Sequence, residues 1–219
     1  MMLKPDFFAH DSCEVAKALL GKIIRRKYKN HWLSARIIET EAYYLSDKAS
    51  HSSLGYTEKR KAMFMPAGTI YMYYARGHDS LNISCGNEGD AVLIKSAFPV
   101  IDSLSPQKSI SIMQKLNPAT DGSIRPVEKL CAGQTLLCKS LYLKVKDWDQ
   151  KSFDKNEFYI DESKQPVTKI IQTTRLGIHA ERDAHLFYRF IDAEYAKFCT
   201  RNPLTKRGYK ADKDFKITS

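Results

Sequence analysis

Alternating apolar and polar residues predict β-strands over much of the chain, and the most informative strand spans residues 35–43, ARIIETEAY. Glu39, Glu41 and Tyr43 follow the β-branched pair Ile37 and Ile38 at every second position. Because residues two apart share one face of a strand, we expect two carboxylates and a phenol to project together. An alternating acidic strand is also typical of a solvated face, so this pattern alone leaves both interpretations open.

The same kind of periodicity predicts the other elements and the fold class. Strands are expected at residues 22–28, 32–40, 69–74, 81–85, 91–97, 157–160, 168–172 and 186–191. Helices are expected at residues 11–20, 109–116 and 127–137. Together they indicate an α+β fold, a single domain around a curved, mostly antiparallel β-sheet with flanking helices.

The length of the chain and the composition of its C-terminal segment indicate how it is divided into domains. A chain of 219 residues is long enough for one domain with a sizeable core. We assign residues 1–200 to that domain. Residues 201–219, which hold six Lys or Arg against two Asp, are assigned to a solvated, mobile basic C-terminal tail. No apolar run approaches membrane-spanning length and no signal-peptide pattern is seen, so we expect no membrane partner.

The net charge indicates the kind of binding partner, and the cysteine content indicates the cellular compartment. A formal net charge of +10 and a pI near 9.3 suit a polyanionic partner such as DNA, bound through phosphate contacts. A basic protein without such a partner would have the same balance. Five cysteines, an odd number without CxxC spacing, argue against a disulfide framework or a zinc site. We therefore expect an intracellular, reducing compartment: the cytoplasm and nucleoid of a bacterium or the nucleus of a eukaryote.

Two more features lie within the sixty residues 36–95 that include the acidic strand. Tyr71, Tyr73 and Tyr74 precede a predicted hairpin tip at residues 75–80, and a polar loop carries His51. Each has an ordinary explanation, since tyrosine favours half-buried strands and a single loop histidine is seldom functional. Their combination with two carboxylates on a basic chain favours a functional site.

Several motifs occur in a fixed order along the chain. They are LLGK, ARIIETEAY, ASHSS, MFMPAGTIYMYY, RGHDSLNIS, AVLIKSA, KLC and RLGI. This series resembles the alkyladenine (3-methyladenine) DNA glycosylase family over most of the chain. The resemblance implies a DNA repair enzyme of base excision repair that flips alkylated purines, such as 3-methyladenine, out of double-stranded DNA. It would then hydrolyse the N-glycosidic bond and leave an abasic site.

The resemblance also implies roles for five residues. Glu41 would activate the water that attacks the sugar, as a general base. Tyr43, His51 and Tyr73 would hold the flipped base by stacking and cation–π attraction. Asn82 would lie near the base edge and disfavour the exocyclic amine of guanine, although an asparagine at a strand end also bonds local backbone.

The sequence departs from the family pattern in the hairpin and in one strand. Arg76 stands just before the hairpin glycine, where relatives have a tyrosine that fills the gap left by the flipped base. We predict that Arg76 fills this gap when the hairpin enters the minor groove, with Tyr74 as the alternative wedge. Lys95 replaces a family arginine near the catalytic water, and the hairpin segment looks one residue shorter.

No metal or cofactor is expected, because Glu39, Glu41 and His51 lack the spacing of a zinc site. No lysine stands where Schiff-base chemistry is indicated, so we predict a monofunctional glycosylase. We also expect the protein to act as a monomer. Two alternatives stay open: a glycoside hydrolase that uses Glu39 and Glu41 as its carboxylate pair, and a non-catalytic module that binds damaged DNA. Release of free base from methylated DNA separates all three.

Overall fold

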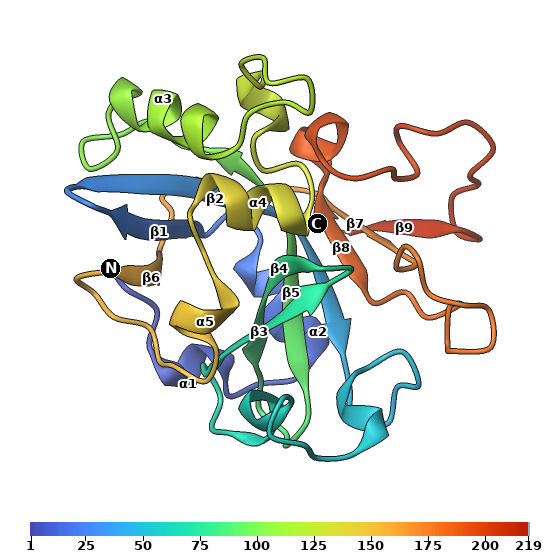
Figure 1. The fold of residues 1–219 in the computed structure, drawn as a ribbon. Helices are drawn as coiled ribbons and strands as arrows, with labels where there is room; N and C mark the ends of the chain where they lie inside the picture. Colours follow the sequence, from blue (N-terminus) through green and yellow to red (C-terminus); the bar gives the residue numbers. More distant parts are fainter. Residues whose placement is uncertain (219) are drawn as a thin grey trace.

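The computed structural model describes residues 1–218, and its nine strands form one sheet (Figure 1). The strands are β1 (Ile23–Tyr28), β2 (His31–Tyr43), β3 (Ile70–Ala75), β4 (His78–Ser84), β5 (Ala91–Pro99), β6 (Phe158–Asp161), β7 (Ile170–Thr173), β8 (Arg189–Asp192) and β9 (Phe215–Thr218). Their order is β3-β4-β5-β2-β8-β7-β9, with β1 beside β2 and β6 beside β1. Every pairing between these strands is antiparallel. The predicted α+β class with a mostly antiparallel sheet is confirmed.

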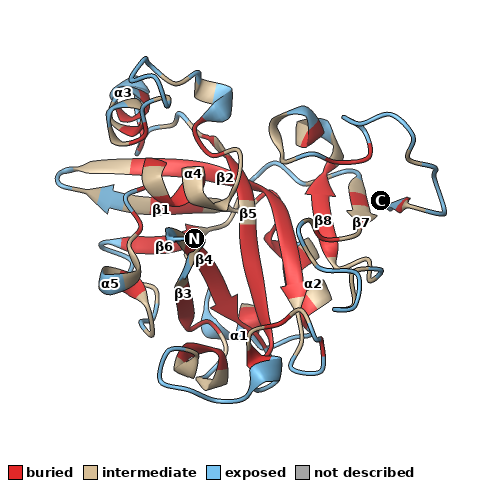
Figure 2. Cartoon of the chain, turned by 45° about the vertical axis from the view of Figure 1, so that its right-hand side comes forward, coloured by how far each residue is buried: buried red, intermediate tan, exposed pale blue. Residues whose placement is uncertain are grey.

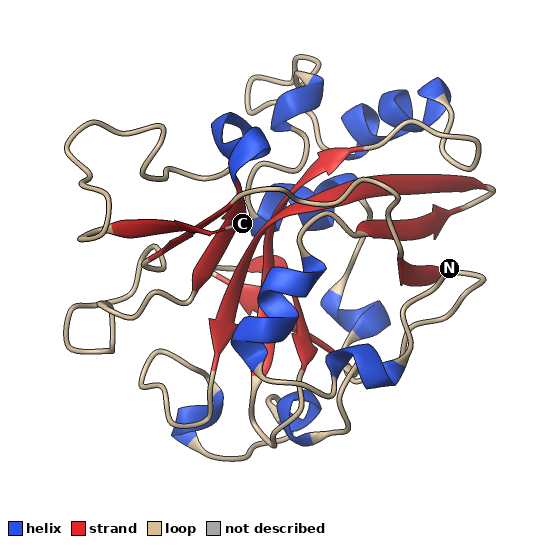
Figure 3. Cartoon of the chain, turned by 180° about the vertical axis from the view of Figure 1, so that it is seen from behind, coloured by secondary structure: helices blue, strands red, loops and turns tan. Residues whose placement is uncertain are grey.

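Short helices flank the sheet. They are α1 (Pro5–Phe8), α2 (Ser12–Leu19), α3 (Gln107–Leu116), α4 (Gln134–Ser140) and α5 (Val145–Trp148), with 3-10 turns η1 (Ser52–Leu54), η2 (Lys61–Phe64), η3 (Val127–Lys129) and η4 (Ala193–Phe198). Asp11 caps α2, because its carboxylate accepts from the backbone N–H groups of Cys13 and Glu14. Viewed from behind, α2 crosses in front of the sheet, whereas α4 is in front in the opposite view (Figure 3). Helices therefore cover both faces of the central strands.

Strand β2 lies at the centre of the molecule. Its first half pairs with β1, and its second half lies between β5 and β8. Residues 33–42 are all buried, and burial is concentrated on β2 and β5 (Figure 2). Glu39 and Glu41 are both 0% exposed, so the interpretation of this strand as a solvated acidic face is wrong. A central strand covered on both faces needs partners for every charge that it carries.

The pairing of β2 with β5 is irregular next to the acidic residues. Glu39 pairs with Ser96 and Thr40 with Ile94, so Lys95 is an extra residue on β5. Such a β-bulge bends the strand and re-aims a side chain. Here the Lys95 ammonium comes within 3.3 Å of the Glu41 carboxylate.

Two sequence predictions need correction. The helix expected at residues 127–137 is instead the turn η3 and the separate helix α4, because Gly133 between them has φ +116°. Residues 201–218 are not a free tail: β9 pairs with β7, and Asn202 is buried. Ser219, the last residue of the expected tail, lies outside the described residues, and the predicted boundary at residue 200 stays a prediction.

The hairpin tip is shorter than expected. The last pair joins Ala75 and His78, so only Arg76 and Gly77 form the turn. Both have positive φ values, 51° and 80°, as in the two-residue turns that match the twist of a hairpin. No helix among residues 1–218 is long and apolar enough to cross a membrane.

Candidate active site

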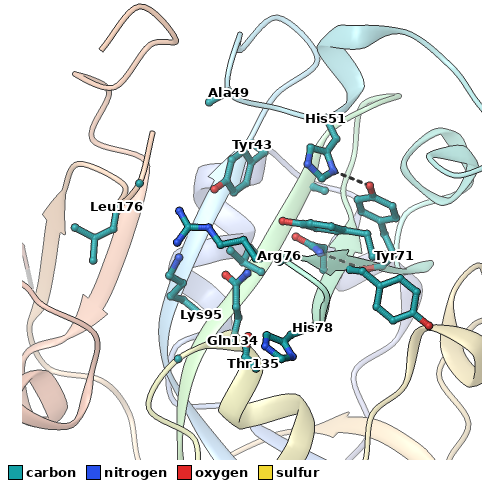
Figure 4. A pocket seen from close by; sticks show the side chains of 18 of the residues that line it. Tyr43, Ala49, His51, Tyr71, Arg76, His78, Lys95, Gln134, Thr135 and Leu176 are labelled. Carbon is teal, nitrogen blue, oxygen red and sulfur yellow. Dashed lines mark hydrogen bonds between the residues drawn. The ribbon is translucent and has the colours of Figure 1, made fainter. Parts of the chain in front are cut away.

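A cavity of about 740 Å³ opens beside the central strands. Its wall combines Tyr43 of β2, Tyr73 of β3 and Lys95 of β5 with the loop of His51 and the hairpin tip at Arg76. Residues 132–136 and 176–178 complete the wall. The structure therefore brings residues from distant parts of the sequence to one cavity, among them most of the predicted site (Figure 4).

Glu41 is completely buried behind two residues of the cavity wall, Tyr43 and Lys95, and contacts both. Its Oε2 accepts a hydrogen bond of 2.7 Å from the Tyr43 hydroxyl, and its Oε1 lies 3.3 Å from the Lys95 ammonium. Oε1 has no hydrogen-bond partner within the described residues. The carboxylate is thus held through both oxygens, by a hydrogen bond from Tyr43 at Oε2 and by the ion pair with Lys95 at Oε1. Burial and the adjacent Glu41 raise the pKa of Tyr43 well above its usual value, which keeps the phenol protonated as a donor.

Three aromatic rings form the other side of the cavity. The rings of His51 and Tyr73 are in edge contact, with centroids 4.3 Å apart. The hydroxyl of Tyr71 hydrogen-bonds His51 Nδ1 at 2.9 Å, and its ring stacks on Tyr73 at 5.5 Å. Figure 4 shows Tyr43 on one side and His51 with Tyr71 on the other. The group can therefore present aromatic faces to a flat ligand placed beside Tyr43.

His51 is held neutral by its surroundings. Burial lowers the pKa of its imidazole, and the nearby cations Arg60 and Arg182 lower it further. A neutral imidazole has one N–H donor and one acceptor nitrogen. Because Nδ1 is engaged by Tyr71, the other ring nitrogen can interact with a ligand.

Asn82 lines the same cavity from β4. Its side-chain amide donates a long hydrogen bond, 3.3 Å, to the backbone carbonyl of Tyr71 on the neighbouring strand. The local backbone contact that the sequence left open is thus present, and the side chain still borders the cavity.

Glu39 forms a separate, structural network. Its Oε1 accepts from Arg189 at 2.7 Å and from the Thr200 hydroxyl at 2.6 Å. Its Oε2 accepts from Ser96 at 2.5 Å and from the Thr200 backbone at 3.0 Å. Burial by itself would raise the pKa of Glu39, but Arg189 and these hydrogen bonds outweigh burial and lower it. Glu39 therefore ties β2 to β8 and to the chain after η4, and it is not available as a second catalytic acid.

The hairpin tip projects its side chains at the cavity mouth. Tyr74 is 60% exposed, and Arg76 is exposed but lines the cavity. Arg76 adopts the left-handed backbone region, which is uncommon for residues other than glycine, asparagine and aspartate. The tip is anchored at its base, because Asp79 accepts from the backbone of Val145 and pairs with Lys144.

Sequence reasoning missed Arg175, the arginine of the RLGI motif. Its side chain is 0% exposed, forms a two-pronged ion pair with Asp47 and donates to the backbone carbonyl of Ala42. Its guanidinium also lies 4.6 Å from the centre of the Tyr43 ring. Arg175 therefore links the Tyr43 ring to Asp47 and to the backbone of β2. The motif marked the position, but only the fold shows what it contacts. Tyr71 was noted as part of the tyrosine run without a role, and it orients His51.

The described residues contain no cluster of three or more His, Cys, Asp or Glu that could hold a metal ion. Within the basic stretch of residues 59–61, Arg60 binds the backbone carbonyls of Leu54 and Gly55, so it stabilises its own loop. Lys59 is exposed and Lys61 half-buried. This loop adjoins His51 and adds positive charge near the cavity.

Comparison with known proteins adds an independent finding. A family model described as methylpurine-DNA glycosylase (MPG) matches residues 6–196. A protein of Pseudomonas savastanoi pv. phaseolicola, provisionally named 3-methyladenine DNA glycosylase, is 58% identical over 212 residues, which cover 96% of this chain and 95% of the relative. A protein of Pseudomonas aeruginosa (strain UCBPP-PA14) with the same provisional name is 55% identical and covers 97% of this chain and 89% of its own. A third such protein, from Carboxydothermus hydrogenoformans, is 34% identical and covers 87% and 94%.

Proposed function

The chain belongs to the methylpurine-DNA glycosylase family, and we propose that its cavity binds an alkylated purine while Glu41 activates the water that releases it. The protein is a DNA-3-methyladenine glycosylase, a hydrolase of N-glycosyl bonds that serves base excision repair. The observation that carries the assignment of Glu41 is its contact with Tyr43 and Lys95, which both line the cavity, while its Oε1 receives no hydrogen bond from the described residues. Oε1 would accept the proton of the nucleophilic water.

The reaction is a single hydrolysis at the sugar carbon C1′. A water oxygen forms a bond to C1′ as the bond from C1′ to the purine nitrogen breaks, and the bonding electron pair leaves with the base. Glu41 Oε1 takes the water proton, a role that typically accelerates a reaction by ~10²–10⁴-fold. Its negative charge also stabilises positive charge on the sugar in the transition state. Tyr43 and Lys95 fix the carboxylate, because both contact it and both line the cavity.

The base would lie between Tyr43 and the pair His51 and Tyr73. Stacked aromatic faces suit a flat purine, and their negative π-faces attract the cationic rings that alkylation often produces. Neutral His51 adds no opposing charge. Asn82 borders the same space, which supports its predicted role at the base edge.

The β3–β4 hairpin would enter the minor groove. A damaged base must leave the stack before its glycosidic bond can be reached, and a wedge must take its place. Exposed Tyr74 and Arg76 at a tip that is anchored at its base support this placement. We assign the wedge to Arg76, since it lies at the turn itself and also borders the cavity. The partner is double-stranded DNA with alkylated bases, and we propose that the enzyme acts as a monomer.

Glu39 separates this proposal from a glycoside hydrolase with two catalytic carboxylates. All the acceptor capacity that a second carboxylate would need is used by Arg189, Ser96 and Thr200. Glu41→Gln tests the proposal, because the amide keeps the shape of the side chain but takes no proton from water. We expect it to lose release of free base from methylated DNA while its affinity for lesion DNA stays within about tenfold. Excision at the wild-type rate in a single turnover would show that Glu41 is not the base.

A further inference from the structure

A buried ion pair joins two segments of the cavity wall, and one of its members also contacts Tyr43. The side chains of Arg175 and Asp47 are 0% and 1% exposed, and the guanidinium contacts the carboxylate through both Nη1 and Nη2. Arg175 directly precedes residues 176–178 and Asp47 shortly precedes residues 49–51, and both of these segments line the cavity. The two charged residues themselves lie outside the cavity wall. The proposed reaction uses neither charge, so the pair needs another explanation.

The guanidinium of Arg175 also holds the end of β2. Its Nη1 donates a hydrogen bond of 3.1 Å to the backbone carbonyl of Ala42, and its central carbon lies 4.6 Å from the centre of the Tyr43 ring. A guanidinium is planar, presents its N–H donors in fixed directions and stacks on aromatic rings. One arginine side chain can therefore fix a carboxylate, a carbonyl and a ring relative to one another.

Asp47 organises the loop that carries His51. Its Oδ1 accepts a hydrogen bond of 2.9 Å from the backbone N–H of Ala49, and its backbone carbonyl accepts one of 2.8 Å from the N–H of Ser50. Ala49, Ser50 and His51 follow one another in the cavity wall. Figure 4 shows Ala49 and His51 beside Tyr43 at the same cavity. A shift of the Asp47 carboxylate would therefore move the residues that lead directly to His51.

We propose that Arg175 is a positioning residue that, together with Asp47, clasps Tyr43 to the His51 loop and so sets the slot into which the flipped base stacks. This inference rests on the proposed function, in which the base lies between Tyr43 and the pair His51 and Tyr73. Stacking requires ring faces at a close and defined separation, so a shift of either wall weakens it. Replacing a buried ion pair by apolar residues is often neutral for stability. The geometry that the Arg175–Asp47 clasp fixes, rather than stability, accounts for its presence.

The double substitution Arg175→Met and Asp47→Asn removes the clasp without leaving a buried charge unpaired. The amide keeps an oxygen that can accept from the Ala49 N–H. The equilibrium constant for the flipped state, read from the fluorescence of an ethenoadenine duplex, should fall about tenfold, within the range for loss of one base-stacking contact. Affinity for undamaged DNA should stay within about twofold, because the buried clasp contacts no phosphate. Both quantities are measured well below the thermal transition of the variant.

The matched control is Arg36→Met with Asp192→Asn. Arg36 is a buried arginine of β2 that pairs with Asp192 at 3.2 Å and lies 5.4 Å from the centre of the Tyr195 ring. Like Asp47, Asp192 also accepts from a nearby backbone N–H, that of Glu194. Arg36, Asp192 and Tyr195 lie outside the cavity wall. The control therefore removes an equivalent ion pair, and it should leave the flipping equilibrium within about twofold because sites without shared partners act nearly independently.

Loss of flipping in the Arg175 and Asp47 variant, but not in the control, supports the clasp. Flipping equal to wild type in that variant, or an equal loss in both double variants, would overturn it. Arg175→Lys keeps the positive charge but lacks the planar fork, so flipping should stay reduced, and flipping at the wild-type level would overturn the geometric role. A wild-type enzyme that leaves the fluorescence unchanged would overturn the base slot and the clasp with it. A wild-type signal that the Arg175 and Asp47 variant keeps would overturn the clasp alone.

Discussion

Glu39 and Glu41 are two residues apart and both fully buried. We nevertheless expect that replacing Glu39 by glutamine affects stability, whereas replacing Glu41 by glutamine affects excision. Glu39→Gln should lower stability and leave the chemistry intact. The wild-type carboxylate receives four hydrogen bonds and pairs with Arg189, whose side chain is 1% exposed. The amide cannot neutralise Arg189, and its NH₂ group replaces an oxygen that accepts from two donors. Removing one partner of a buried ion pair typically costs ~3–5 kcal/mol.

This loss of unfolding free energy corresponds to a measurable decrease in Tm. For a protein of this length, ~1 kcal/mol corresponds to roughly 2–4 °C in Tm, so Glu39→Gln should lower Tm by roughly 6–20 °C. Thermal or urea unfolding measures this loss. Single-turnover excision, run well below both transitions, should stay within about threefold of wild type, because Glu39 takes no part in the proposed reaction. An unchanged Tm would refute the structural role, and lost excision in a folded Glu39→Gln variant would refute the separation of the two carboxylates.

The ion pair of Glu39 with Arg189 also predicts how stability depends on pH. The pKa of Glu39 is lowered from its ordinary value of 4.5, so the folded state holds its proton less tightly than the unfolded state does. The stability that Glu39 provides is therefore fully present above the ordinary pKa and is lost as the pH falls through the lowered one. The stability difference between wild type and Glu39→Gln should stay constant near neutral pH and narrow only in acid. A gap that opens or closes between pH 6 and 8 would point to another group.

Three further predictions concern the base and the DNA. Tyr43→Ala and Tyr73→Ala should each weaken retention of the flipped base by ~1–3 kcal/mol, which the fluorescence of an ethenoadenine duplex reports; an unchanged signal in both would exclude the stacked arrangement. Binding to undamaged DNA should weaken steeply between low and physiological salt, since a net charge of +10 releases counterions from DNA, and a flat salt titration would count against phosphate contacts. Arg76→Ala should lose flipping and excision together and Arg76→Tyr should restore much of both, whereas a nearly silent Arg76→Lys with a crippling Tyr74→Ala would make Tyr74 the wedge.

Local pattern was sufficient for much of the fold. The helix at residues 12–19 has its Asp11 cap and its Gly21 stop in the sequence itself, and strands with clear periodicity form close to where they were expected. The helix predicted at residues 127–137 failed because apolar spacing continues across Gly133, whose backbone conformation ends one element before the next begins. Strand β9 was missed because it is only four residues long, three of them exposed, and pairing with β7 holds it in the sheet.

In the candidate site, too, some features could be predicted from the sequence and others only from the fold. Glu41, Tyr43, His51 and Tyr73 carry motif signals; the structure brings Tyr43, His51 and Tyr73 to one cavity and places Glu41 in contact with Tyr43. What separates Glu39 from Glu41 could not be predicted, because it depends on Arg189 and Thr200, which are more than a hundred residues away along the chain. The contacts of Arg175 with Asp47 and Tyr43 are likewise properties of the folded chain.

Release of free base by Glu41→Gln is the measurement that tests the central claim most directly. Duplex DNA that carries 3-methyladenine or 7-methylguanine is incubated with excess enzyme, and the liberated base is quantified in a single turnover. Wild-type enzyme should release the base and leave an abasic site, whereas Glu41→Gln should bind the same DNA within about tenfold and release none above background. Glu41→Gln that is folded, binds lesion DNA and excises at the wild-type rate would contradict the assignment of Glu41 as the base that activates water.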